Sequence, residues 1–345
     1  MKLLFITQKI DANNTVLGFV HGWLAEFAKR FSHISVICLE KGEYHLPANV
    51  SVFSLGKEGG RSQVKYLKNF VRYIVQNRRE YDVVLVHMNQ EYILLGGLIW
   101  KILGKPIFMW RNHYAGSWLT RIAVAFCTEV FCTSKFSYTA KFRKTVVMPV
   151  GVDITLFRPV ANVSRIPNSI LFYARISPAK RPNILLEALA LLSSDNVQFS
   201  ASFYGSPLPQ DTGFFEQLKK KVQDKGLAQK VRFVAGVPHA EGPRVFSAHE
   251  IFVNLSPSGM YDKTLFEAAG CECLVVASSL DFKQLAGERF SFPQDDAEEL
   301  AGKLKHLLSL SNAAKQELGR ELRILAVEQH SLEMLGKRLY KELTK

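Results

Sequence analysis

Short apolar runs alternate with longer amphipathic segments along the first half of the chain. The runs are rich in β-branched and aromatic residues, which is typical of buried strands. Strands are therefore predicted at residues 2–7, 33–39, 50–55, 81–87, 106–110, 129–133 and 145–149. Apolar residues at helical spacing predict helices between several of these runs, at residues 19–30, 60–79 and 93–103. This alternation predicts a mostly parallel sheet that is covered by helices on both faces.

The same alternation restarts after a break near residue 150. A strand ends at Pro149, Gly151 permits a turn, and Pro159 keeps the next segment from becoming a long helix. Further strands are predicted at residues 170–174, 197–204, 231–234, 251–255, 274–277 and 290–293, with a helix at 182–192. Residues 313–345 are predicted to form one or two charged amphipathic helices. The chain is therefore expected to be an α/β protein whose pattern occurs twice.

Length and composition agree with a folded, two-domain protein. The 345 residues suffice for two domains of roughly 150–180 residues, and 48% hydrophobic with 22% charged residues is ordinary for a soluble chain. The first apolar run is too short for a signal peptide. Residues 92–110 are broken by glycine, lysine and proline, so no bilayer span is expected. Five cysteines without zinc-finger spacing are expected to be buried thiols in a reducing cytoplasm.

Positive charge is concentrated in the first half. Residues 1–160 carry 21 Lys and Arg against 10 Asp and Glu, a net charge of +11, whereas residues 161–345 carry 23 against 21, a net charge of +2. The first half is therefore expected to bind an anionic partner. Nucleic-acid binding is a weak explanation, because no recognised motif is present and the cations are not interleaved with exposed aromatics.

The predicted helix at residues 60–79 is the most charged segment of that half. Its apolar positions are expected to face the core: Val64, Leu67, Val71, Ile74 and Val75. Its cations are expected on the other side: Arg61, Lys65, Lys68, Arg72 and Arg79. Two interpretations stay open, a solvated helix face and an interfacial surface for anionic lipid headgroups.

The clearest candidate for a binding site is the stretch from Gly259 to Gly270. It follows an apolar run, and Asp262 and Thr264 offer N-cap side chains for a helix that Gly270 is expected to end. A glycine-containing loop that leads into a helix is a natural anion site, because free backbone N–H groups and the helix dipole favour negative charge there. Glu267, one turn inside, is placed to bind a sugar hydroxyl beside a phosphate. An ordinary βα turn with a surface glutamate is the alternative.

Two cations are expected at the same crevice. Arg175 ends one predicted strand and Lys180 opens the next helix, and ligands of such sheets bind at the carboxyl ends of the strands. The pair offers fixed positive charge for a diphosphate, and the chain has no D-x-D sequence to hold Mg²⁺. Gly205 marks a further turn on that edge. His113, after another strand, is a candidate for contacting a reacting hydroxyl or phosphate, although a structural histidine is the alternative.

In this order and spacing, the chain resembles family 4 of the retaining glycosyltransferases, the glycosyl transferases group 1. The features that carry the resemblance run along nearly the whole chain: Gly18, the crossing at 149–153 with Phe157, the Arg175 and Lys180 pair, and Glu267-Ala-Ala-Gly270 before a Val-Val strand. Members of that family have the GT-B fold, which consists of two facing Rossmann-like domains. Each domain is a mostly parallel sheet with helices on both faces.

The resemblance implies a role for each site residue. Arg175 and Lys180 would hold the donor diphosphate, and His113 would lie near the transferred sugar, so these three are the catalytic candidates. Glu267 would bind the ribose of the nucleotide, and Gly18 would let the N-terminal loop approach the donor. The remaining substrate-binding candidates are the loop and helix start at Gly259, Met260, Tyr261, Asp262, Lys263 and Thr264, together with Gly205.

The resemblance also implies a role for each domain and a reaction. Residues 1–155 with about 326–345 would form the N-terminal acceptor-side domain, and residues 156–325 the nucleotide-sugar-binding domain. The enzyme would move a sugar, with retained configuration and without a metal or other cofactor, from a UDP- or GDP-linked donor. The acceptor would be a glycan or a lipid-linked glycan of cell-envelope polysaccharide or glycoconjugate biosynthesis. We expect a cytoplasmic protein at the inner face of the cell membrane, with no nucleic-acid partner.

One position departs from the family pattern. The family has two glutamates separated by seven residues, and here the second is Glu267 while the first is replaced by Gly259. The missing glutamate normally contacts hydroxyls of the donor sugar, so the donor stays open. Asp262 is an alternative ligand for that sugar. A non-catalytic GT-B protein that binds a sugar nucleotide or another polyanion is the competing function.

Overall fold

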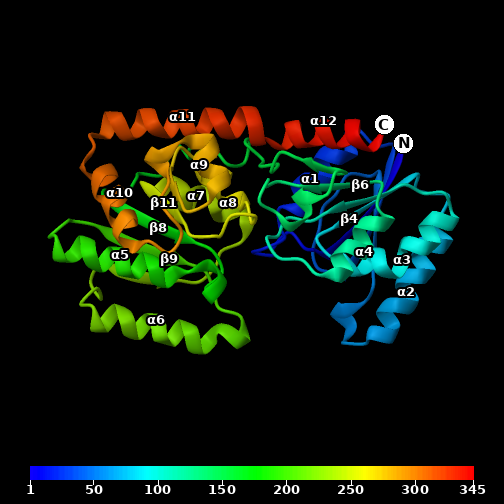
Figure 1. Cartoon of the computed structure of the whole chain (residues 1–345), viewed down its shortest axis with the longest axis horizontal. Helices are drawn as coiled ribbons and strands as arrows, with labels where there is room; N and C mark the ends of the chain where they lie inside the picture. Colours follow the sequence, from blue (N-terminus) through cyan, green and yellow to red (C-terminus); the bar gives the residue numbers. More distant parts are fainter. The chain divides into compact units, whose positions relative to one another are not determined.

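The computed structural model describes residues 1–345 and divides them into two compact units. The first unit comprises Met1–Gly151 and Leu332–Lys345, and the second comprises Val152–Ser331. Each unit is built on one sheet, of seven strands in the first and five in the second (Figure 1). Every strand pairing in both sheets is parallel. The predicted α/β class with two Rossmann-like sheets is confirmed.

The sheet of the first unit has the strand order β3-β2-β1-β4-β5-β6-β7. The strands are β1 (Lys2–Ile10), β2 (His33–Lys41), β3 (Val50–Ser54), β4 (Val83–His87), β5 (Ile107–Trp110), β6 (Glu129–Cys132) and β7 (Thr145–Val147). The chain adds strands to one side of β1 and then continues from β4 on the other side. The topological switch point of this unit therefore lies between β1 and β4.

Alternate residues of these strands fill two separate cores. On β1, Leu3 and Phe5 belong to one core, and Leu4 and Ile6 belong to the other. Helices α1 (Val20–Ala28) and α12 (Leu332–Leu343) cover the first core. Helices α2 (Gln63–Gln76), α3 (Glu91–Ile102) and α4 (Trp118–Phe126) cover the second.

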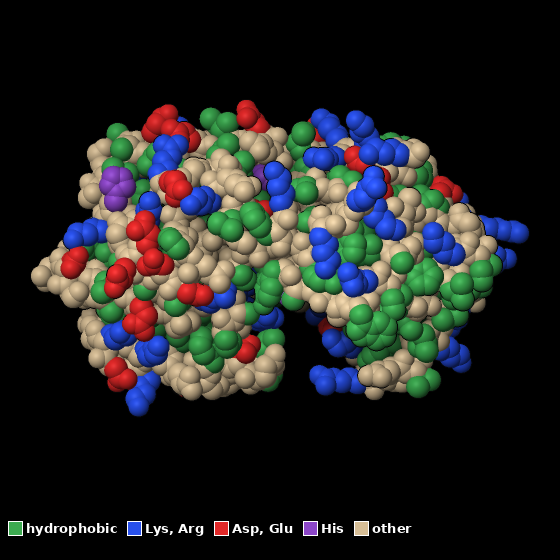
Figure 2. Space-filling view, in the orientation of Figure 1, with side chains coloured by type: hydrophobic (Ala, Val, Ile, Leu, Met, Phe, Trp, Pro, Cys, Tyr) green, Lys and Arg blue, Asp and Glu red, His purple; other side chains and the backbone are tan.

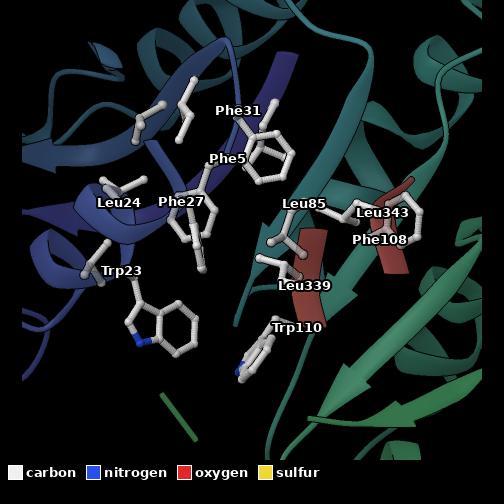
Figure 3. Packing of buried hydrophobic residues seen from close by; sticks show 14 of the residues in the cluster. Phe5, Trp23, Leu24, Phe27, Phe31, Leu85, Phe108, Trp110, Leu339 and Leu343 are labelled. Carbon is white, nitrogen blue, oxygen red and sulfur yellow. The ribbon is translucent and has the colours of Figure 1, made fainter. Parts of the chain in front are cut away.

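The last helix of the chain completes the core of the first unit. Leu339 and Leu343 of α12 lie in the same buried cluster as Leu85 of β4 and Phe108 of β5 (Figure 3). Leu335 and Leu339 are 0% exposed, so this helix is a structural part of the first unit and not a surface tail.

The second unit has the strand order β10-β9-β8-β11-β12. Its strands are β8 (Ser169–Tyr173), β9 (Ser200–Tyr204), β10 (Val231–Val234), β11 (Ile251–Asn254) and β12 (Leu274–Ala277). Its helices are α5 (Pro182–Ser194), α6 (Thr212–Asp224), α7 (Gly242–Ala248), α8 (Lys263–Gly270), α9 (Leu280–Ala286), α10 (Ala297–Ser309) and α11 (Asn312–His330). Helix α5 packs against α6 and α10, whereas α8 packs against α7 and α11 on the other side of the sheet (Figure 1). The switch point lies between β8 and β11.

Two expectations about these elements are wrong. Residues 290–293 form no strand, and only Ser291 makes an isolated bridge, to Ala277. Helix α2 buries Phe70 and Ile74, while Val64, Leu67 and Val75 are 80%, 46% and 39% exposed. The aromatic ring of Phe70 packs against Tyr92 and Trp100 of α3 and so fixes the rotation of the helix. Of the expected aliphatic row, Ile74 and Val71 therefore pack on the core, whereas Val64, Leu67 and Val75 do not.

All five cysteines are buried free thiols, as expected from their apolar surroundings. Burial raises the pKa of the Cys38 and Cys127 thiols to about 12. No helix combines the length and the apolar composition that crossing a membrane requires.

Gly151, the last residue of the first segment, generates a stability prediction. Its φ is +75°, and a Cβ there would lie 2.2 Å from Cδ2 of the fully buried Leu335. Its carbonyl accepts a hydrogen bond of 3.0 Å from Trp23 Nε1. Gly151→Ala should lower the free energy of unfolding by on the order of 2–4 kcal/mol, because it adds core overlap to backbone strain.

Gly104→Ala is the matched control. Gly104 has a similar φ of +65° but open space where a Cβ would be, so only backbone strain of about 1 kcal/mol is expected. Urea unfolding of both variants measures the difference, and equal losses would show that α12 does not constrain Gly151.

Candidate functional site

The candidate site lies at the carboxyl edge of the second sheet. Because its strands are parallel, the loop after β8 (residues 174–181) and the loop after β11 (residues 255–262) lie at the same edge, on the two sides of the switch point. Lys180 joins them: its Nζ donates to Ser256 Oγ at 2.8 Å and pairs with Asp262 Oδ2 at 2.5 Å. Of the predicted residues of these two loops, Lys180 and Asp262 are thus brought together.

Asp262 is the centre of a polar cluster. Besides Lys180, its Oδ2 accepts hydrogen bonds from Ser256 Oγ and, at 3.2 Å, from Asn254 Nδ2. Asn254 Oδ1 in turn accepts from the Ser256 N–H at 3.1 Å, which fixes the start of the loop. Burial acts to raise the pKa of Asp262, but Lys180 and the two hydrogen bonds hold that pKa below its ordinary value. The carboxyl group is therefore ionised and committed to Lys180.

The expected N-cap role of the Asp262 and Thr264 side chains is wrong. Asp262 does occupy the N-cap position of α8, but its side chain accepts no hydrogen bond from a helix N–H. Its carboxylate turns toward Lys180, and the Thr264 hydroxyl accepts from Asn254 Nδ2 at 3.5 Å. The start of α8 therefore lacks a side-chain cap.

Gly259 and Met260 shape the loop before α8. Gly259 has a φ of +87°, in the left-handed region that favours glycine. The departure from the family glutamate thus coincides with a backbone conformation that a glutamate would adopt only with strain. The Met260 N–H donates to Pro257 O at 3.2 Å, so one of the amides expected to bind ligand is used within the loop.

Glu267 is buried, at 4% exposure, so the interpretation as an ordinary surface glutamate is wrong. Its Oε1 lies 3.0 Å from His239 Nε2. The imidazole of His239 in turn lies against Phe157, with ring centroids 5.0 Å apart. Burial, together with the Glu267 charge, raises the pKa of the neighbouring Tyr173. The carboxylate of Glu267 is therefore held in one orientation, one turn inside α8.

Lys263, the first residue of α8, is the third cation of this edge. Burial lowers the pKa of Lys263 to about 7, although the Glu267 charge acts to raise it. Burial and the neighbouring Lys263 lower the pKa of His330 to about 4, and the His330 ring stacks on Phe266 at 3.9 Å. The charge of Lys263 consequently changes near neutral pH, whereas His330 stays neutral there.

Glycines let the backbone elements of this edge approach one another. A Cβ on Gly205 would lie 1.9 Å from Ala174 O, so glycine is needed where the end of β9 passes the segment before the exposed Arg175. A Cβ on Gly270 would lie 2.7 Å from Phe157 O. The helix ends at Gly270, as predicted, and Gly270 is also a packing contact; the left-handed residue after the helix is Glu272, with φ of +56°.

Several polar residues of the site were missed by the sequence analysis. Asn254 and Ser256 hold Asp262, and His239 holds Glu267. Ser177 and Ser279 are 3% and 1% exposed, and neither Oγ has a hydrogen-bond partner among protein atoms. A usable signal existed for Ser256 alone, since it directly follows the strand predicted at residues 251–255.

Two further predicted residues, Gly18 and His113, lie in the first unit. Gly18 is buried in the turn before α1, and its N–H donates to Asn14 O at 3.0 Å. His113 lies in the loop after β5, where Nδ1 accepts the Ala115 N–H at 2.9 Å and the ring stacks on Tyr114. Burial, with a contribution from Arg111, lowers the pKa of His113. The lowered pKa favours the neutral ring at pH 7.

The two parallel, Rossmann-like units place this chain in the GT-B class. HepE of Anabaena, crystallised in complex with UDP and glucose, aligns over 100% of both chains with a TM-score of 0.81 at 20% sequence identity. The sucrose-phosphate synthase of Thermosynechococcus elongatus aligns over 100% of this chain and 99% of its own, with a TM-score of 0.78 and 15% identity. At such identities the likeness establishes the fold, and the GT-B prediction is confirmed.

Sequence comparison finds similarity in the second unit. Residues 167–310 match the family model described as glycosyl transferases group 1. The D-inositol 3-phosphate glycosyltransferase of Geodermatophilus obscurus is 28% identical over 155 residues, which are 41% of this chain and 34% of the relative. The chain thus spans about a third of the length of the curated relatives it matches. The predicted resemblance is confirmed: the second unit carries the sequence pattern of the group 1 glycosyl transferases.

The pair between Lys180 and Asp262 predicts a pH-dependent stability. A carboxyl whose pKa is lowered by folding stabilises the native state above its unfolded pKa, and this stabilisation is lost as pH falls through the lower, folded pKa. Asp262→Asn should therefore destabilise the protein at pH 7 by about 1–3 kcal/mol, since Lys180 loses its ionised partner. The difference from the unmodified protein should shrink below about pH 4.

Asp295→Asn serves as the control for that measurement. Asp295 pairs with Arg181 at 2.7 Å in the same unit but is 49% exposed, so a loss of at most about 1 kcal/mol is expected. Urea unfolding at a series of pH values compares the two variants. A pH-independent effect of Asp262→Asn would contradict the assignment of an ionised pair.

Proposed function

We propose that this protein is a retaining glycosyltransferase of family 4 that moves a sugar from a UDP- or GDP-linked donor to a glycan or lipid-linked acceptor. The observation that carries the proposal is the junction of Lys180 with the loop before α8, beside the buried Glu267, at the switch point of the unit that matches the family. UDP, with glucose, is bound in the HepE structure that shares this fold, which supports a nucleotide-sugar donor.

Arg175 and Lys180 would hold the donor diphosphate in this proposal. Lys180 is placed by Asp262 and Ser256, and the uncapped start of α8 adds backbone N–H groups and the positive end of the helix dipole. As the bond from the sugar to the diphosphate breaks, negative charge grows on the leaving oxygen, and these groups stabilise it. That oxygen would accept the proton of the acceptor hydroxyl. The mechanism needs neither a protein nucleophile nor a metal ion or other cofactor.

Glu267 would bind the ribose hydroxyls of the nucleotide. Its carboxylate is desolvated and held by His239, so it presents its remaining acceptor capacity in a fixed direction. A buried acceptor that loses a hydroxyl partner carries a desolvation cost, which gives the site selectivity for a nucleoside. Ser177 and Ser279 supply further buried hydroxyls without protein partners near the same edge.

The donor sugar is the open part of the site. Gly259 offers no carboxylate to its hydroxyls, and Asp262 Oδ2 already accepts hydrogen bonds from Lys180, Ser256 and Asn254. We therefore assign Asp262 to the positioning of Lys180 and not to replacement of the absent glutamate. Recognition of the sugar then falls to backbone groups of the loop at 259–263 and to the first unit, where Gly18 and His113 are the candidates.

The net charge of the first half of the chain is the basis for proposing an acceptor and a location. The first 160 residues carry a net charge of +11, so we propose an anionic acceptor surface: a cell-envelope glycan, lipid-linked, reached by a cytoplasmic enzyme at the inner face of the membrane. The competing function is a non-catalytic protein that binds a sugar nucleotide or polyanion. It is favoured by Gly259 and by the partial neutralisation of Lys180 by Asp262.

The test is incubation with a panel of UDP- and GDP-sugars. Release of free nucleotide supports the transferase, and thermal stabilisation by a nucleotide without any release supports the binding protein. Neither stabilisation nor release with any member of the panel would overturn both functions.

Removing either diphosphate cation should abolish most turnover. Arg175→Ala and Lys180→Ala should each lower kcat/KM by on the order of 10²-fold or more, because each removes charge stabilisation from the transition state. Lys221→Ala is the control, since Lys221 pairs with Glu187 on a helix surface and should leave kcat/KM unchanged. Near-normal activity of either site variant, with native circular dichroism, would remove these residues from the mechanism.

Glu267→Gln should act on binding more than on chemistry. The amide keeps the shape but loses the charge that receives the ribose hydroxyls, so nucleotide Kd should rise about tenfold while kcat changes little. Calorimetric titration with the preferred nucleotide measures this, and Glu241→Gln, in the same segment as His239, is the control. A large fall in kcat at unchanged affinity would assign Glu267 to the reaction itself.

A further inference from the structure

The outer faces of α2, α3 and α4 carry an unusual number of exposed apolar side chains. We call this surface the helix face and define its apolar part by eight residues: Val64, Leu67, Val75, Leu95, Leu98, Ile102, Trp118 and Ile122. Four of them are highly exposed: Val64 at 80%, Ile102 at 77%, Trp118 at 68% and Leu98 at 63%. Figure 2 shows hydrophobic side chains gathered over this part of the first unit, with Lys and Arg beside them.

The helix face is one continuous surface. On α3, Leu95, Leu98 and Ile102 follow each other at helical spacing, and on α4 Trp118 and Ile122 lie four residues apart. Helix α3 packs against α4 on one side and, through Phe70 and Trp100, against α2 on the other. The inner faces of the three helices share one core, so their outer faces lie side by side.

The second unit does not have a comparable number of exposed hydrophobic residues. Seventeen large hydrophobic residues are exposed in the chain; thirteen lie in the first unit and four in the second, although the second unit is larger. Single exposed hydrophobics are normal on soluble proteins, but contiguous patches mark interaction surfaces. Eight of the seventeen on three adjacent helices therefore indicate a partner.

The charge of the helix face indicates which kind of partner binds it. Residues 61–126 contain ten Lys and Arg but three Asp and Glu, a net charge of +7. Cations of the helix face alternate with its apolar residues: Lys65, Lys68, Arg72, Lys101 and Arg121. The salt bridges of the first unit involve other cations, namely Lys2, Lys9, Lys29, Arg30, Lys57, Lys337 and Lys345. The charge of the helix face is thus available to an external anion.

We propose that the helix face binds the surface of an anionic lipid bilayer. Apolar side chains that project from a helical surface enter the boundary between headgroups and acyl chains, and interspersed Lys and Arg attract anionic headgroups. Trp118 is suited to that boundary, because its ring is apolar and its N–H is polar. A second copy of the chain is a poorer occupant, since a symmetric contact would set two such cationic faces against each other.

This inference deepens the proposed function, on which its connection to a lipid-linked acceptor rests. It also changes the sequence-based picture, in which the basic side of residues 60–79 alone would meet lipid. The structure turns Val64, Leu67 and Val75 to the same side as the cations and adds the apolar rows of α3 and α4. Binding thus requires both burial of apolar groups and charge.

Co-sedimentation with vesicles tests the inference without any need for turnover. Vesicles of phosphatidylcholine alone are compared with vesicles of phosphatidylcholine and phosphatidylglycerol at a 7:3 ratio. The protein should partition into the anionic vesicles at least tenfold more strongly at low salt, and added salt should reduce the difference. Lys68→Gln with Arg72→Gln should reduce this partitioning about tenfold or more, because each surface cation contributes up to about fivefold.

Leu98→Gln with Ile102→Gln should reduce partitioning by a similar factor while keeping the preference for anionic vesicles. The matched control is Leu191→Gln with Ile324→Gln, which removes exposed apolar residues of the second unit, 39% and 54% exposed, and should leave partitioning unchanged. Full binding by either helix-face variant, equal binding to both vesicle types, or no binding to either would overturn the inference. A dimer that the Leu98 and Ile102 changes dissociate would assign the face to self-association instead.

Nucleotide release from the UDP- and GDP-sugar panel is measured on the same variants. Neither α3 nor the exposed positions of α2 belong to the proposed donor site, so release should be unchanged by these substitutions. Vesicle binding without nucleotide release would leave the lipid surface standing and count against the transferase. Nucleotide release without vesicle binding would support the transferase and overturn the proposed lipid surface.

Discussion

Parallel strand pairing is the constraint on which the rest of this structure depends. Each strand must be followed by a crossover before the next parallel strand can form, so the loops that leave the strands all emerge at one edge. Where the winding direction changes, between β8 and β11, two such loops diverge and leave room for a ligand. Lys180 and Asp262, which are 82 residues apart, meet there because of this topology and not because of any local sequence signal.

The sequence was sufficient for what depends on the pattern of buried residues. Apolar runs located the strands of both sheets, and the rule for parallel sheets located Arg175, Lys180 and Glu267 at one edge. The sequence was insufficient where side-chain packing decides which of two similar helix faces is buried. In α2, Leu67 and Phe70 both lie at helical spacing from the buried Ile74, and only the contact of Phe70 with α3 decides which of them faces the core. Residues 290–293 have the composition of a strand but find only one pairing partner.

The side-chain partners inside the site also could not be predicted from the sequence. His239 reaches Glu267 from a different crossover, and Asp262 turns away from the helix it precedes because a lysine from another loop offers a stronger, charge-assisted hydrogen bond. A local cap was the reasonable expectation for an aspartate before a helix, but a distant cation overrode it. Because of the same competition, the loop with Gly259 still contains a carboxylate, which is paired with Lys180.

The place of α12 has a consequence for how the chain folds during synthesis. Residues 1–151 leave the ribosome before the second unit, but the buried cluster of their sheet also needs Leu335, Leu339 and Leu343, which emerge only after the second unit. The second unit is contiguous in sequence and contains all of its own strands, so it can fold before the first unit is complete. Part of the apolar surface of the N-terminal unit therefore stays uncovered until α12 has been synthesised.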